Sequence, residues 1–99
     1  MFLQIQYFMI SIELKFLFEG VIFSAPVHFL ASQESKSRLQ FIVTFATKYL
    51  INRYAKGYTL TLENNSFNPI PLCDKKEGEL LKSLQEAIIN HPEIAPAIA

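Results

Sequence analysis

The chain has 99 residues, 51% of them hydrophobic and 18% charged, and its formal net charge at pH 7 is zero. A single domain of this length can bury a core without disulfides or metals. The one cysteine, Cys73, excludes an internal disulfide and a thiolate metal site. Such an apolar chain with so few charges favours a surface that a partner or a second copy covers in part.

The first 31 residues are apolar enough to raise the question of a membrane span. Glu13, Lys15 and Glu19 interrupt them, so no uncharged apolar run reaches the ~18 residues that a span needs. No basic stretch precedes the apolar part, as it would in a secretory signal. We therefore expect a cytoplasmic protein with no membrane association.

Residues 9–31 predict a β-hairpin around which the rest of the chain is organised. Apolar and polar residues alternate on both sides of Glu19-Gly20, with the period of two that is typical of strands. With Glu19-Gly20 as a two-residue loop, opposed residue numbers sum to 39, and every pair on one face is apolar. A slip by one residue would destroy that face, so the register is well specified.

The outer edges of this hairpin are the first candidate contact surfaces. Pro26 falls opposite Glu13 at a position that makes no hydrogen bond to the first arm, which indicates that the second arm is an edge strand. Residues 2–8 extend past most of the second arm and lack a partner there. We expect this segment to pair with a strand of this chain or of a second copy, with the interface residues Leu3, Ile5 and Tyr7.

A long helix is predicted from Ser32, as N-cap, to about Lys56, with Gly57 following its end. Phe41 and Phe45 widen its apolar arc beyond what one sheet face would cover, so we expect them to contact a protein partner. The inward stripe of this helix is formed by Leu39, Ile42, Val43, Ala46, Tyr49 and Leu50.

The last third of the chain predicts a strand and a second helix. Residues 58–62 alternate as a strand does, and Asn64-Asn65-Ser66 is a turn signal. Pro69 and Pro71 leave open whether residues 67–72 form a fourth strand. Asp74 and Glu77 open the second helix as a capping-box-like pair. The apolar face of that helix comprises Leu80, Leu81, Leu84, Ala87 and Ile88.

Together these elements predict an α+β fold of the order ββαβ(β)α. We expect a two-layer sandwich in which a mainly antiparallel sheet of three to four strands carries two helices on one face. A right-handed crossover would give the strand order second, first, third. Residues 1–91 form the single domain, and residues 92–99 form a short mobile C-terminal tail.

No residue set points to catalysis, a cofactor or a metal. Ser11 and His28 are opposed on the polar sheet face with Glu13 beside them, which resembles a Ser–His–acid arrangement. An open sheet face, however, offers neither a pocket nor oxyanion donors. Cys73 has acidic neighbours in place of a nearby histidine, and two histidines make a metal site improbable. We therefore expect a non-catalytic protein without cofactors.

Two functions follow from what remains. The apolar excess favours a small protein that works through protein–protein contacts, as a homodimer or as a minor subunit of a larger assembly, and the outer-face pair Leu17 and Ile22 offers one further contact. The alternative is a nucleic-acid-binding module, because residues 32–57 carry five basic residues against one acidic residue. Its contacts would be Lys36, Arg38, Lys48 and Lys56.

Overall fold

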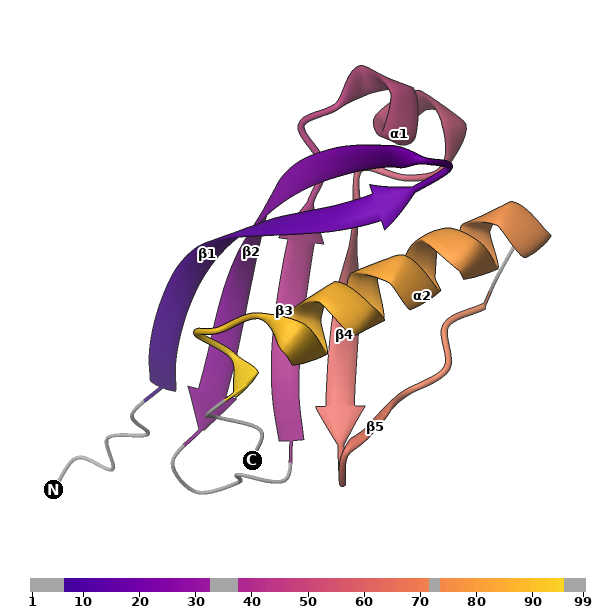
Figure 1. The fold of residues 1–99 in the computed structure, drawn as a ribbon. Helices are drawn as coiled ribbons and strands as arrows, with labels where there is room; N and C mark the ends of the chain where they lie inside the picture. Colours follow the sequence, from indigo (N-terminus) through magenta and orange to yellow (C-terminus); the bar gives the residue numbers. More distant parts are fainter. Residues whose placement is uncertain (1–6, 33–37, 72–73, 96–99) are drawn as a thin grey trace, which may run out of the picture.

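The computed structural model describes residues 7–32, 38–71 and 74–95. In this part of the chain, five strands form one antiparallel sheet, and neighbours in the sheet are neighbours in the sequence. The sheet curls around α2, whereas α1 lies at one end of it, between β3 and β4 (Figure 1). The elements are β1 (Tyr7–Phe18), β2 (Val21–Ser32), β3 (Arg38–Thr44), α1 (Lys48–Arg53), β4 (Gly57–Glu63), β5 (Ser66–Phe67) and α2 (Lys75–Asn90).

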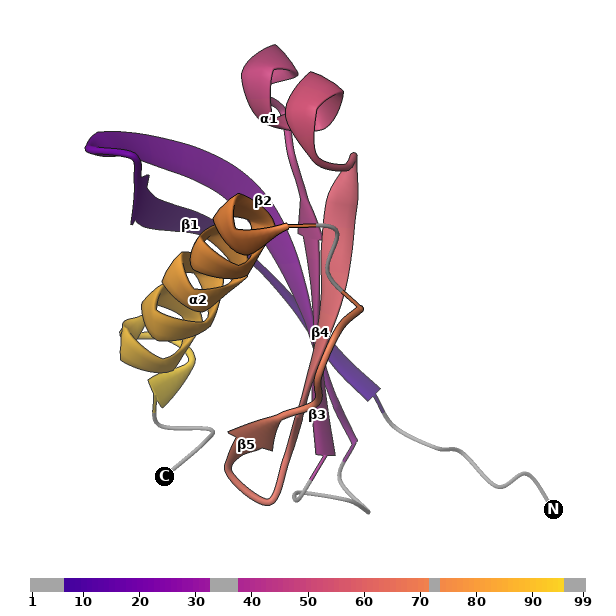
Figure 2. The ribbon, with the colours of Figure 1, turned by 90° about the vertical axis from the view of Figure 1, so that its right-hand side faces the viewer.

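The α+β class is confirmed, but the sheet has five strands in the order β1-β2-β3-β4-β5. The expected order of second, first, third is wrong, because β2 lies between β1 and β3. The placement of both helices on one face is corrected as well. Of the two described helices, α2 crosses the concave face of the sheet, whereas α1 caps the end where the hairpin turns (Figure 2).

The β1–β2 hairpin has the predicted register from Ile10 opposite Phe29 to Phe18 opposite Val21, and the pairing continues beyond the predicted pairs to Tyr7 opposite Ser32. Its loop residues Glu19 and Gly20 have φ values of 52° and 75°, as a type I′ turn requires. Tyr7 therefore pairs within this chain, and the expectation that it overhangs the second arm is wrong. Leu3 and Ile5 lie outside the described residues.

The predicted helix from Ser32 to Lys56 is wrong over much of its length. Residues 38–44 form β3, and among the described residues of this segment only Lys48–Arg53 are helical. The run Phe41-Ile42-Val43-Thr44 is aromatic and β-branched, and such side chains fit a pleated sheet better than a helix surface. Gly57, expected to follow the helix, is the first residue of β4.

Pro26 lies opposite Glu13 as predicted, but it marks a boundary within β2. Strand β3 pairs with β2 only over Val27–Ala31, so β2 is an edge strand from Val21 to Pro26 and a central strand afterwards. Proline has no N–H with which to continue the ladder toward β3. The half of the hairpin nearer its turn, up to Pro26, has no β3 beside it and bends over α2 (Figure 2).

The segment after β4 settles the open question about a fourth predicted strand. Asn64 and Asn65 form the turn with φ values of 51° and 66°, and only Ser66 and Phe67 pair with β4. The amide of Asn68 then donates to the carbonyl oxygen of Thr61 at 2.8 Å. Residues 68–71, which contain two prolines, form no strand.

Helix α2 closes the concave face of the sheet. Its N-cap is the predicted Asp74, whose Oδ1 accepts a hydrogen bond from the amide of Glu77 at 2.8 Å. The predicted apolar face is confirmed, since Leu80, Leu84 and Ile88 are completely buried. Ile94, which lies within the segment expected as a tail, is also buried.

Candidate protein interaction surface

The outer edge of β1 has no partner strand among the described residues. This strand has 12 residues, and among the described residues it pairs with β2 alone. Phe18 and Val21 flank a two-residue loop, so they form a hydrogen-bonded pair, and the pattern alternates from there along the hairpin. The N–H and C=O groups of Ser11, Glu13 and Lys15 therefore face away from β2, which makes this edge a template for another strand.

An apolar patch lies where the hairpin turns. Leu17 and Ile22 are opposed on the outer face and are 61% and 71% exposed. Val21, on the other face of the ribbon, is 51% exposed. We call these three residues the tip patch. The prediction that Leu17 and Ile22 share the outer face is confirmed.

Helix α1 holds the hairpin turn against the end of the sheet. The Glu19 carboxylate accepts long hydrogen bonds, of 3.4–3.5 Å, from the hydroxyls of Tyr49 and Tyr54. The Tyr49 ring stacks on Phe23 with 6.4 Å between centroids. Arg53 donates from Nε to the Tyr54 hydroxyl at 3.2 Å, and this bond is the largest cause that raises the pKa of Arg53 above its usual value. The position of the tip patch is thus fixed by contacts to α1.

Phe41 and Phe45 are not part of this surface. They are 0% and 4% exposed, and the Phe41 ring stacks on Phe29 with 5.0 Å between centroids. In a strand, residues at odd positions share one face, which here is the face toward α2. The expectation that these two phenylalanines meet a partner is therefore corrected, because they belong to the core.

The basic residues expected to bind nucleic acid do not share a helix. Arg38 begins β3 and approaches Glu63 with an Nε–Oε1 distance of 3.7 Å. Lys48 is the first residue of α1 and Lys56 follows that helix, at the opposite end of β3, about 20 Å away for a strand of 7 residues. Lys36 lies outside the described residues.

The polar arrangement on the outer sheet face is present in part. Ser11 Oγ and His28 Nδ1 are hydrogen-bonded at 2.9 Å, as their opposition predicted. Glu13 lies on the same face, but it has no hydrogen bond or ion pair within the described residues. No group of three or more potential metal ligands occurs in the described ranges. The geometry is that of a solvent-exposed polar pair on an open sheet face.

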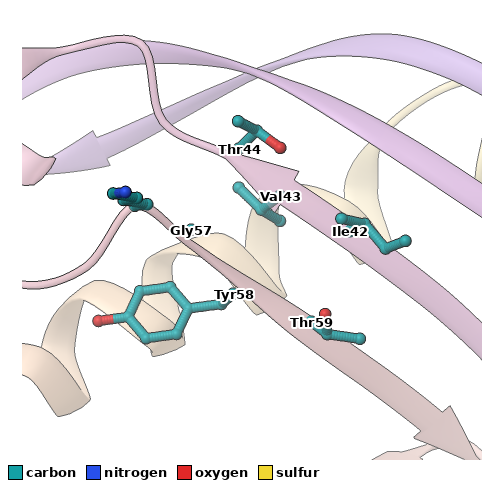
Figure 3. Close-up of a pocket in the computed structure, with 7 residues that line it drawn as sticks. Ile42, Val43, Thr44, Gly57, Tyr58 and Thr59 are labelled. Carbon is teal, nitrogen blue, oxygen red and sulfur yellow. The ribbon is translucent and has the colours of Figure 1, made fainter.

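Two of the hollows lined by described residues lie away from this surface. One, of about 240 Å³, lies beside the glycine of β4 and is lined by the ends of β3 and β4 with Lys56 as its one charged residue (Figure 3). The other, of about 470 Å³, lies between residues 67–70 and α2, with Lys82 as its one charged residue. Neither hollow brings an acid and a base together, so neither offers acid–base chemistry.

Sequence reasoning assigned Glu77 to a helix cap and missed its burial. Its side chain is 7% exposed, and its carboxylate accepts a hydrogen bond from the Tyr58 hydroxyl at 2.6 Å. Tyr58 lies on the inner face of β4, where its sequence alternation placed it. This bond joins β4 to the first turn of α2 and has a structural role.

Comparisons with protein-family models, with curated proteins and with solved structures gave no match. Within the described residues, no helix is both long and apolar enough to cross a membrane.

Proposed function

We propose that this chain is a non-catalytic protein that acts through protein–protein contacts, as a homo-oligomer or as a small subunit of a larger assembly. The observation that carries the proposal is the free edge of β1, a strand of 12 residues with nothing paired to its outer side in the described part of the chain. Long free edges attract further strands, and proteins usually shorten, cover or charge them. The exposed tip patch lies at the end of the same edge.

Ser11 permits a direct test of edge pairing. Its amide faces the free edge, so Ser11→Pro removes one outward donor and leaves the hydrogen bonds between β1 and β2 in place. Ser11→Ala is the matched control, because it also loses the hydroxyl bond to His28 but keeps the amide. In size-exclusion chromatography with light scattering, we expect an oligomeric mass for the wild type and Ser11→Ala, and a smaller mass for Ser11→Pro.

Circular dichroism of each variant shows whether the fold is intact. A wild-type chain that is monomeric up to its solubility limit would contradict the homo-oligomer. An oligomer that Ser11→Pro leaves unchanged, with an unchanged fold, would show that another surface makes the contact.

Nucleic-acid binding is the second hypothesis, and it now lacks the single helix on which it was based. Lys48 and Lys56 are close to α1, whereas Arg38 is near Glu63. The same chromatography tests this hypothesis when ultraviolet absorbance is recorded. A chain with 4 tyrosines and no tryptophan absorbs weakly, so bound nucleic acid would dominate the absorbance of the complex. Binding that weakens steeply with salt would support this hypothesis.

A further inference from the structure

Glu13 and Lys15 are two opposite charges on the free edge, and neither has a charged partner in the described part of the chain. Both are exposed on the outer face of β1, two positions apart, and their cross-strand neighbours are Pro26 and Ser24. Neither side chain makes a hydrogen bond or an ion pair within the described residues. One oppositely charged side chain placed across the edge from each would satisfy both.

A second copy of β1 supplies those charges in a single register. If two β1 edges pair antiparallel about a two-fold axis at Leu14, opposed residue numbers sum to 28, and each Glu13 faces the Lys15 of the other copy. Moving the axis to Glu13 sets glutamate against glutamate, and moving it to Lys15 sets lysine against lysine. Like charges directly opposite one another are destabilising, so charge selects the axis at Leu14.

The same register is consistent with the backbone and with the apolar face. The outward amides of β1 are those of the odd-numbered residues, so Glu13 and the other copy's Lys15 form a hydrogen-bonded pair. Residues 10 to 18 of one copy then oppose residues 18 to 10 of the other, and the core side of each strand continues on the same side of the joined sheet. Ile10, which is 40% exposed on that side, would lie opposite Phe18 of the other copy.

We propose that two copies of this chain join through their β1 edges, antiparallel and centred on Leu14, with Glu13 paired to Lys15 in both directions. This interface rests on the proposed function and states which partner, which edge and which register. It would extend the five-stranded sheet of each copy into one continuous sheet.

Charge exchange tests the register. Glu13→Lys gives a chain with two lysines at these positions, and Lys15→Glu gives a chain with two glutamates, so each variant alone opposes like charges. We expect each to raise the dimer Kd about tenfold, because two cross-strand pairs per dimer change sign. An equimolar mixture should recover wild-type affinity as a heterodimer, and the double variant E13K/K15E should recover it as a homodimer.

Spin-label distances locate the axis independently. In a C73S background, Ser11→Cys and Leu17→Cys each place a label three residues from Leu14, so the two copies of either label should be about 20 Å apart. An axis at Glu13 would instead give about 14 Å for position 11 and about 27 Å for position 17. Equal distances support the proposed register, and unequal distances overturn it.

The outcomes separate this inference from the broader proposal. If the wild type is a dimer but Glu13→Lys and Lys15→Glu form heterodimers no more readily than homodimers, the proposed register is wrong. The broader proposal that the chain acts through protein–protein contacts would still stand. A wild-type chain that is always monomeric overturns self-pairing altogether, and the remaining form of the proposed function is a subunit bound to a different protein.

Discussion

At Gly57 the sheet has no space for a side chain. Gly57 pairs with Thr44 at the end of β3, and a Cβ atom built on it would overlap the backbone carbonyl oxygen of Val43. That neighbour belongs to a strand ladder and cannot move away as a flexible side chain could. The requirement for glycine here is therefore one of space.

Gly57→Ala should lower the free energy of unfolding by about 2 kcal/mol, because the ladder between β3 and β4 must shift to admit the methyl group. Urea denaturation followed by circular dichroism measures this loss.

Gly20→Ala is the matched control for that substitution. Gly20 has a φ of 75° and nothing within 4 Å of its built Cβ, so alanine there costs only the left-handed backbone, about 1 kcal/mol. If Gly57→Ala proves no more destabilising than Gly20→Ala, the close approach to Val43 is not the reason for the glycine.

At the scale of elements, α2 depends on its first turn. The Asp74 carboxylate accepts a hydrogen bond from the amide of Glu77. The Glu77 side chain in the same turn accepts a hydrogen bond from the Tyr58 hydroxyl. Asp74→Ala should destabilise the protein by about 1 kcal/mol, which for a domain of this size lowers Tm by about 4–8 °C. Asp74→Ser keeps a capping oxygen and should retain most of the stability. Equal melting temperatures for alanine and serine would show that the cap contributes little.

The hairpin and α2 were predictable because local and global signals agree in them. The alternation around Glu19-Gly20 determines the register, and a cap, an apolar stripe and a stop determine the helix. Residues 38–44 misled because Leu39, Ile42 and Val43 also fit a helical stripe. The contrary signal was Phe41, which widened the apolar arc of that helix but shares one face with Leu39 and Val43 in β3.

The candidate surface was predictable only in part. The outward Leu17 and Ile22 follow from alternation alone. Which strand is the free edge depends on the pairing of β2 with β3, a contact that the alternation within the hairpin does not determine. Pro26 predicted that the whole second arm is an edge strand, which holds only for Val21–Pro26, because β3 begins to pair at the next residue.

At the scale of the whole molecule, self-pairing would make stability depend on concentration. If the folded chain dimerises and the unfolded chain does not, each tenfold rise in chain concentration adds about 1.4 kcal/mol of stabilisation per dimer. Tm measured by differential scanning calorimetry should then rise with concentration for the wild type. Under the same conditions it should rise less for Glu13→Lys, and a wild-type Tm that is constant over a wide range would contradict the dimer.

The position of α2 after the strands of the sheet has a consequence for synthesis. All five strands precede it, and each pairs with its sequence neighbour, so the sheet can assemble as the chain emerges from the ribosome. The apolar face of the sheet stays uncovered until Leu80, Leu84 and Ile88 of α2 have been synthesised and pack against it. A chain that stops before residue 75 would expose that face together with the free edge of β1, and such an incomplete chain should aggregate.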